Sequence, residues 1–381
     1  MIIDSHAYCF MPIDSAAGFA SVAEHMKWVQ AAVAGHHQPI LRIPDRTTTD
    51  AMALASDDKN ALASLPDLDL RADHHEGRVL WTVEGQHHTK YWFPPNLRNL
   101  EFTPQSLISE MDYAGVNLAL LHTDPSLGRD LAYLAKCVQE YPNRLRCMAP
   151  VDEWRIAEQT DDVIHELRLA ITEHGLHAIK FNADLAYLHS KSPWDDGPYR
   201  PFWEAVESLN VPVFFTLGMG RSHAPVPTGY LQEQAVLIRW MERYPNTTCS
   251  LTHGFPWRCL LQDGRIMFPD TIWQPFENPN CHLEVCLPVR LGDLFDFPYR
   301  DLWPVLEQMV ERIGATQLLW GTDMPFQNRF CTYRQSRNWI EKYCTFLSDE
   351  DRRQIMGKTA ARILAKSLDG ETGTTGDLAS G

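Results

Sequence analysis

The sequence contains 381 residues, of which 44% are hydrophobic, and carries 12 Trp, 16 Phe and a formal net charge of -15 at pH 7. This length and apolar content can fill the core of one large domain. The negative charge argues against nucleic acid and anionic membranes as partners, because both require a positively charged protein surface. A small molecule or another protein is therefore the expected partner.

The N-terminus and the cysteines indicate where the protein works. No basic region precedes an apolar run at the N-terminus, and no stretch approaches the roughly 20 apolar residues that cross a bilayer. Nine Cys are scattered without a Cys-x-x-Cys pair, which argues against a disulfide framework or a zinc ribbon. We expect a cytoplasmic protein with reduced thiols.

Strand-like and helix-like stretches alternate from residue 103 onward, after one strand at the start of the chain. Apolar, β-branched runs predict eight strands. They cover residues 2–8, 116–122, 144–152, 176–182, 211–218, 247–254, 281–288 and 317–325. Helices are expected between the last seven strands and at 348–364. A helix at 103–114 can be capped by Thr103 with Pro104 in its first turn, and Ser348 with Asp351 has the spacing of a capping box.

This alternation is typical of an α/β protein. Eight strands with intervening helices favour a (β/α)₈ TIM barrel with a long insertion after the first strand. An open doubly wound sheet is the alternative, and it is less favoured because no Gly-x-Gly-x-x-Gly follows the first strand.

Residues 9–102 form the insertion, within a single barrel domain that spans residues 1–369. The insertion contains three His pairs and the aromatic run KYWFPP at 90–95. Because it follows the carboxyl end of a strand, where barrels place their active sites, we expect it to be a lid or a subunit contact. The Gly/Thr-rich tail at 370–381 has no apolar pattern and is predicted to be disordered.

Polar side chains recur where the predicted strands end. The two-residue period of a strand places Asp4, His6 and Tyr8 on one face. A single strand histidine is more often a hydrogen-bonded core residue than a ligand, but several imidazoles and buried carboxylates at one barrel mouth suit a divalent metal such as Zn, Fe or Mn. The candidate metal ligands are His6, His122, His253, Glu284 and Asp323.

Four motifs carry a resemblance to a known family. IIDSHAY, LTHGFP, LLWGTDMP and IMGKTAARIL resemble segments of the amidohydrolase superfamily, in its branch of decarboxylases, lactonases and related hydrolases. The family pattern is His-x-His on the first strand, a His on the fifth, a His on the sixth and an Asp on the eighth. The resemblance assigns His6, His253 and Asp323 to three of these positions and implies a metal-dependent barrel enzyme.

Two positions depart from this pattern. Tyr8 replaces the second histidine of the first strand, and Thr216 replaces the histidine of the fifth strand. A tyrosine is a poor ligand at neutral pH because its phenol ionises near a pKa of about 10. We therefore expect the usual metal site of the family to be either absent or rebuilt, and a rebuilt site could use His122 and Glu284 as further ligands.

Three other stretches, LLHTDPSLGR, HLEVCLP and FCTYRQS, are similar to the amidohydrolase-related metal oxygenases, a subset that includes 2-aminoisobutyrate hydroxylase. This resemblance implies one or two transition metals and the pairing of unlike subunits. A homo-oligomer, or a hetero-oligomer with a related barrel subunit, is accordingly expected. Lys180 ends the fourth strand, where other family members carry a carboxylated lysine, although an ion pair is the more frequent role of a strand lysine.

The principal functional hypothesis is a metal-dependent hydrolase or decarboxylase that acts on a small carboxylated substrate. Asp323 or His253 would move the proton, and Arg334, Tyr333 and Tyr8 would bind the substrate. One alternative is a subunit of a metal-dependent oxygenase. Another is a degenerate barrel that serves as a structural partner, which the departures at two ligand positions favour.

Overall fold

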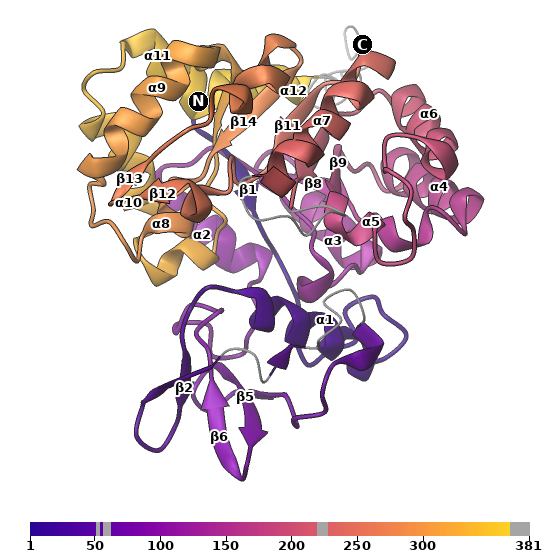
Figure 1. Ribbon diagram of the computed structural model, residues 1–381, viewed down its shortest axis with the longest axis vertical. Coiled ribbons are helices and arrows are strands. Elements are labelled where there is room, and N and C mark those ends of the chain that lie inside the picture. Colours follow the sequence, from indigo (N-terminus) through magenta and orange to yellow (C-terminus); the bar gives the residue numbers. More distant parts are fainter. Residues whose placement is uncertain (51–53, 56–61, 219–227, 366–381) are drawn as a thin grey trace, which may run out of the picture.

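The computed structural model describes residues 1–50, 54–55, 62–218 and 228–365 (Figure 1). Eight parallel strands form one sheet, in the order β1 (Ile3–Ala7), β7 (Leu118–Leu121), β8 (Leu145–Ala149), β9 (Ala178–Asn182), β10 (Val213–Thr216), β11 (Cys249–Leu251), β14 (Cys281–Val285) and β15 (Leu318–Trp320). A parallel bridge between Ala7 and Met324 joins the last strand to the first. The predicted barrel is confirmed, and the predicted disordered tail lies outside the described residues.

Helices surround this sheet, as the alternation predicted. They are α2 (Pro104–Ala114), α3 (Leu131–Glu140), α4 (Thr160–Arg168), α5 (Ala183–Ala186), α6 (Arg200–Leu209), α7 (Thr228–Arg243), α8 (Leu287–Leu291), α9 (Trp303–Ile313), α10 (Tyr333–Asn338), α11 (Asp349–Arg353) and α12 (Thr359–Ile363). The predicted start of α2 is confirmed, because the Thr103 side chain accepts a hydrogen bond from the backbone N–H of Ser106. No helix of the described residues is long and apolar enough to span a membrane.

The last predicted helix, 348–364, is interrupted. Ser348 and Asp351 form the expected capping box at the start of α11. At Gly357 the backbone leaves the helical conformation, and a Cβ there would collide with the carbonyl oxygen of Met1. The helix therefore breaks where it must make room for the N-terminal strand.

The insertion after β1 forms a lobe at one end of the barrel (Figure 1). It contains α1 (Val22–Gly35) and a five-stranded antiparallel sheet made of β3 (Thr48–Thr49), β2 (Ile40–Arg42), β6 (Gln86–Thr89), β5 (Arg78–Val83) and β4 (Arg71–Asp73). Phe10 and Phe102 exchange backbone hydrogen bonds of 2.9 and 3.0 Å, so the insertion leaves and rejoins the barrel at one point. The buried Lys90 donates to the carbonyl of Val33 at 2.6 Å and thereby joins the sheet to α1.

All barrel strands except β9 end earlier than predicted, and two of these ends bear on the site. β11 stops at Leu251 and β15 at Trp320, and a short hairpin of β12 (Leu261–Gln262) and β13 (Arg265–Ile266) follows β11. Beyond these ends, His253 and Asp323 both adopt a φ of 63°. This left-handed conformation is uncommon for residues other than glycine, although Asp and His adopt it more often than most. At both positions this conformation turns the backbone out of the sheet, and the side chains of His253 and Asp323 lie at the barrel mouth.

Candidate metal centre

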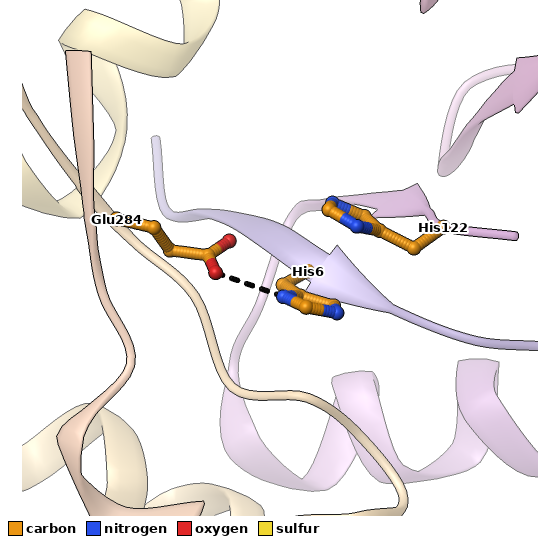
Figure 2. A group of neighbouring side chains, drawn as sticks. All are labelled: His6, His122 and Glu284. Carbon is orange, nitrogen blue, oxygen red and sulfur yellow. Dashed lines mark hydrogen bonds and ion pairs between the residues drawn. The ribbon is translucent and has the colours of Figure 1, made fainter. Parts of the chain in front are cut away.

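The five predicted ligands meet at the end of the barrel that faces the insertion. His6 lies in β1 and Glu284 in β14, whereas His122, His253 and Asp323 follow β7, β11 and β15. Their possible ligand atoms form two groups that share one histidine, and within each group all atoms lie within 4.8 Å of one another. One group is His6, His253 and Asp323, and the other, shown in Figure 2, is His6, His122 and Glu284.

His6 lies between two carboxylates. Its Nδ1 is 2.8 Å from Oε2 of Glu284, and its Nε2 is 3.1 Å from Oδ1 of Asp323. The same Asp323 oxygen is 3.3 Å from Nε2 of His253. Two imidazole nitrogens and one carboxylate oxygen therefore converge on one point from three different strand ends.

The charges of this group depend on one another. Burial lowers the pKa of His6, but Glu284 and Asp323 on its two sides outweigh burial and raise it to about 9. Burial raises the pKa of Asp323, but His253 and His6 hold it well below its usual range. Burial also lowers the pKa of His253 to about 4. The proton on His6 thus supplies the positive charge that two buried carboxylates require.

Glu284 is held by hydrogen-bond donors on both oxygens. Oε2 accepts from the backbone N–H of His253 at 2.6 Å as well as from His6, and Oε1 accepts from the hydroxyl of Ser5 at 3.1 Å. Gly321 leaves space for this carboxylate, since a Cβ there would clash with Oε1. This arrangement fits a carboxylate that orients a histidine ligand through its second nitrogen.

His122 lies beside His6 and has one ring nitrogen without a partner among the described residues. Its ring stacks on that of His6 with centroids 3.7 Å apart, and its Nε2 donates to the carbonyl of Ser5 at 2.8 Å. Burial, together with the charge of His6, keeps its pKa well below the usual value, so the ring is neutral. Its Nδ1 is buried and has no hydrogen-bond partner among the described residues. An unpartnered lone pair beside imidazole and carboxylate donors fits a divalent metal ion.

Of the two positions that depart from the family pattern, Tyr8 contacts the cluster directly. The Tyr8 hydroxyl is 2.9 Å from Nε2 of His6 and accepts a hydrogen bond from Nζ of Lys180 at 3.2 Å. Within the described part of the chain, no carboxylate lies within ion-pair distance of Lys180, so the structure does not show the ion pair that its position suggested. Thr216 ends β10, and its buried hydroxyl oxygen has no partner among the described residues.

A small cavity of about 20 Å³, enough for one water molecule, adjoins Lys180. Glu153 lines it, and its Oε1 accepts from the backbone N–H of Asn182 at 2.7 Å. Its Oε2 is buried and has no partner among the described residues. Burial raises the pKa of Glu153 to about 8, which indicates a neutral carboxylic acid at neutral pH.

Two of the predicted substrate-binding residues, Tyr333 and Arg334, lie outside the cluster. Tyr333 is fully buried and donates to Oδ2 of Asp4 at 2.6 Å. Arg334 is exposed, and its guanidinium lies over the ring of Tyr113, 6.0 Å from the centroid. Consecutive residues of a helix point in directions about 100° apart, so when Tyr333 packs inward its neighbour turns to solvent. The structure does not bring Arg334 to the cluster.

Asp4 does not share the surroundings of His6 as the two-residue period predicted. Its carboxylate contacts Thr322 and Tyr333, whereas the adjacent Ser5 contacts Glu284. The pairing of β1 with β7 shifts in register between Asp4 and Ala7, which interrupts the regular alternation. Ser5 was missed in the sequence for this reason, since alternation placed it on the opposite face.

Comparison with known proteins identifies the family. Residues 110–366 match the amidohydrolase family. The chain belongs to this family. It is 27% identical to γ-resorcylate decarboxylase of Rhizobium sp. over 243 residues, 56% of this chain and 68% of that protein. It is also 27% identical to the same enzyme of Polaromonas sp. over 255 residues, 58% of this chain and 71% of that protein.

Solved structures share the barrel fold. The 2,6-dihydroxybenzoate decarboxylase from Rhizobium superposes with a TM-score of 0.52 and 20% identity, covering 71% of this chain and 90% of that one. The dihydroxybenzoic acid decarboxylase of Polaromonas sp., with bound manganese and 2-nitroresorcinol, gives a TM-score of 0.50 and 20% identity, covering 72% and 91%. Family membership confirms the predicted class, an enzyme of the hydrolase or decarboxylase kind.

Proposed function

We propose that this chain is a divalent-metal-dependent decarboxylase of hydroxylated aromatic carboxylates. The observation that carries the proposal is the convergence of His6 Nε2, His253 Nε2 and Asp323 Oδ1 at the barrel mouth. Its support in the comparisons is the identity with the γ-resorcylate decarboxylases, which extends over more than two thirds of their length.

His6, His253 and Asp323 would hold the metal, with His122 as a further ligand through its unpartnered Nδ1. Glu284 would act on the metal through His6, because its own oxygens already accept hydrogen bonds. Mixed imidazole and carboxylate donors suit Mn, Fe or Zn. Manganese is the first choice because the Polaromonas decarboxylase structure contains it. Bound here, the metal would supply Lewis-acid polarisation of the substrate's oxygens.

The chain's own groups would manage the proton. In decarboxylation the bond from the ring carbon to the carboxyl breaks, and the ring carbon keeps the electron pair and takes a proton. The carboxylate of Asp323 has a second oxygen besides the Oδ1 assigned to the metal, and this oxygen would take a proton from water and pass it to the ring carbon. The Tyr8 hydroxyl, fixed by Lys180 and His6, would contact the substrate ring or its hydroxyl groups.

The insertion would exclude water as the lid of this site. Trp92 and Phe93 pack on Phe326, with ring centroids 5.4 and 5.9 Å apart, and Phe326 packs edge-on against Tyr8 at 5.7 Å. Such an apolar cover suits an aromatic substrate.

We also propose that the protein forms an oligomer, either with copies of itself or with a related barrel subunit. Light scattering of the purified protein would test this.

The test is elemental analysis of the purified protein, followed by incubation of the manganese-loaded enzyme with 2,6-dihydroxybenzoate. We expect stoichiometric metal and release of resorcinol and CO₂, with activity lost on chelation and restored by manganese. Oxygen consumption coupled to product formation would favour the oxygenase alternative instead. Protein that binds no metal and releases no CO₂ would favour the structural-partner alternative.

A further inference from the structure

A small polar cavity lies at the barrel mouth where β7, β8 and β9 end. Its volume is about 20 Å³, and its lining residues end or follow these three neighbouring strands. They include Asp124, Asp152, Glu153, Lys180 and Asn182. None of the five residues of the metal cluster lines it. A cavity of this size holds one oxygen-sized group, such as a water molecule.

Glu153 presents a hydrogen-bonding atom that the protein itself does not use. The residue is 4% exposed, and its Oε1 accepts from the backbone N–H of Asn182 at 2.7 Å. Its Oε2 is buried and has no partner among the described residues. Because an unsatisfied buried oxygen carries an uncompensated desolvation cost, this atom requires a partner in the cavity.

Lys180 connects the cavity to the metal centre. The residue is 4% exposed, and its Nζ donates to the Tyr8 hydroxyl at 3.2 Å. This hydroxyl is in turn 2.9 Å from Nε2 of His6. Two short contacts therefore separate the Lys180 ammonium from a proposed metal ligand. An ammonium has three donors, and within the described part of the chain Tyr8 is the one acceptor that Lys180 finds.

The other charged groups around the cavity are already engaged. Arg129 forms an ion pair with Asp152, which also accepts from Nη1 of Arg155 at 2.9 Å. Asp124 accepts from the backbone N–H of Ser126 at 3.0 Å. An anionic group in the cavity would be repelled by the carboxylates of Asp124 and Asp152, whereas a neutral group would not. The cavity therefore suits a neutral oxygen better than a carboxylate.

A hydroxyl group matches both unused partners. It can accept a hydrogen bond from Nζ of Lys180 and donate its own to Oε2 of Glu153. We propose that the cavity between Glu153 and Lys180 is a subsite that receives one ring hydroxyl of the substrate in place of a water molecule. The inference rests on the proposed function for the hydroxylated aromatic ring. It adds the residues that distinguish a dihydroxylated ring from a monohydroxylated one.

The experiment compares two ligands by calorimetry, 2,6-dihydroxybenzoate and 2-hydroxybenzoate, on manganese-loaded wild type and Lys180→Met. Both ligands are singly charged anions at neutral pH, so a change in the charge of the site alone affects both equally. We expect wild type to bind the dihydroxylated ligand about 10-fold more tightly, because only its second hydroxyl fills the subsite. Lys180→Met, which removes the donor, should bind the two ligands with about equal affinity.

Glu153→Gln tests the other side of the cavity. Its amide oxygen can keep the contact with the backbone of Asn182, which leaves an amide N–H₂ facing the cavity. The substrate hydroxyl then loses its acceptor, so the preference for two hydroxyls should fall to a value between those of wild type and Lys180→Met. The matched control is Glu110→Gln on α2, because Glu110 is half-buried and burial raises its pKa, as it does for Glu153. This control should keep the wild-type preference.

The inference is overturned if Lys180→Met weakens both ligands equally, or if it keeps the wild-type preference. If Lys180→Met does not fold, the preference in Glu153→Gln decides: an unchanged preference overturns the inference and a reduced one supports it. Wild type that releases CO₂ but binds both ligands equally contradicts the inference alone. Wild type that shows the preference without releasing CO₂ contradicts the proposed function alone, and wild type that binds neither ligand contradicts both.

Discussion

Two regions along β1 bury a carboxylate in different ways. Beside α10, Asp4 accepts hydrogen bonds from the hydroxyl of Thr322 at 2.5 Å, the hydroxyl of Tyr333 at 2.6 Å and the backbone N–H of His6 at 3.0 Å. At the barrel mouth, Asp323 faces the imidazoles of His6 and His253. The partners of Asp4 are neutral hydrogen-bond donors, whereas the partners of Asp323 are imidazoles, which can carry or exchange protons.

This difference separates a structural acid from a functional one. Burial raises the pKa of Asp4 to about 7 despite its hydrogen bonds, because no cation lies close enough to offset it fully. The pKa of Asp323 stays well below its usual range because two histidines outweigh the effect of burial. A buried carboxylate satisfied by neutral donors stabilises the fold, whereas one matched to imidazoles has the environment of a metal ligand.

The largest expected effect comes from Asp323→Asn. Asparagine tolerates the φ of 63° and keeps the shape of the side chain, but it can neither carry the negative charge nor exchange a proton. We expect turnover of 2,6-dihydroxybenzoate to fall about 100- to 10,000-fold with little change in the unfolding midpoint. The matched change Asp4→Asn should lower the midpoint and keep metal bound. The contrast between the two regions fails if folded Asp4→Asn loses turnover and Asp323→Asn does not.

The second effect concerns Glu284→Gln. The Glu284 carboxylate accepts hydrogen bonds from Ser5, His6 and the backbone N–H of His253. Glutamine is uncharged and has only one accepting oxygen, so it cannot keep all three hydrogen bonds, and the orientation of His6 becomes less fixed. We expect manganese affinity to weaken about 10- to 100-fold, measured by competition with a chelator of known affinity. Glu153→Gln, a buried change at the same mouth, is the control and should keep the wild-type affinity. If Glu284→Gln binds manganese as tightly as wild type, Glu284 does not orient His6 for metal binding.

Tyr333→Phe tests the structural acid directly. The change removes one donor to Asp4 and leaves its Oδ2 with fewer hydrogen bonds. We expect the free energy of unfolding to fall by about 2 kcal/mol in urea denaturation, with the manganese content unaltered. Loss of metal in the folded variant would show that the two regions of β1 are coupled.

The smallest effect is a pH dependence at Glu153. Its folded-state pKa of about 8 lies above the ordinary 4.5, so the folded protein keeps a proton that the unfolded chain releases between these values. Its contribution to stability is complete below pH 4.5 and is lost as the pH rises toward 8.

Glu153→Gln cannot ionise, so its stability relative to wild type should rise by about 1 kcal/mol between pH 5 and pH 6. Thermal unfolding of both proteins across this range measures the difference. Parallel curves would mean that Glu153 is ionised in the folded protein.

Local sequence patterns were sufficient to predict the barrel fold and to identify the five residues of the cluster. Apolar β-rich runs alternate with helical ones, and such periodicity reports secondary structure directly. His6, His122, His253, Glu284 and Asp323 could be found because strand ends in a barrel meet at one mouth, wherever they lie in the sequence.

The orientations within that mouth depended on contacts between distant segments. The register shift in β1 turned Ser5 toward Glu284 and left Asp4 with Tyr333, against the two-residue period. Packing of α10 turned Arg334 to solvent. Periodicity specifies which element a residue belongs to, but the neighbours of its side chain are set by how separate elements pack.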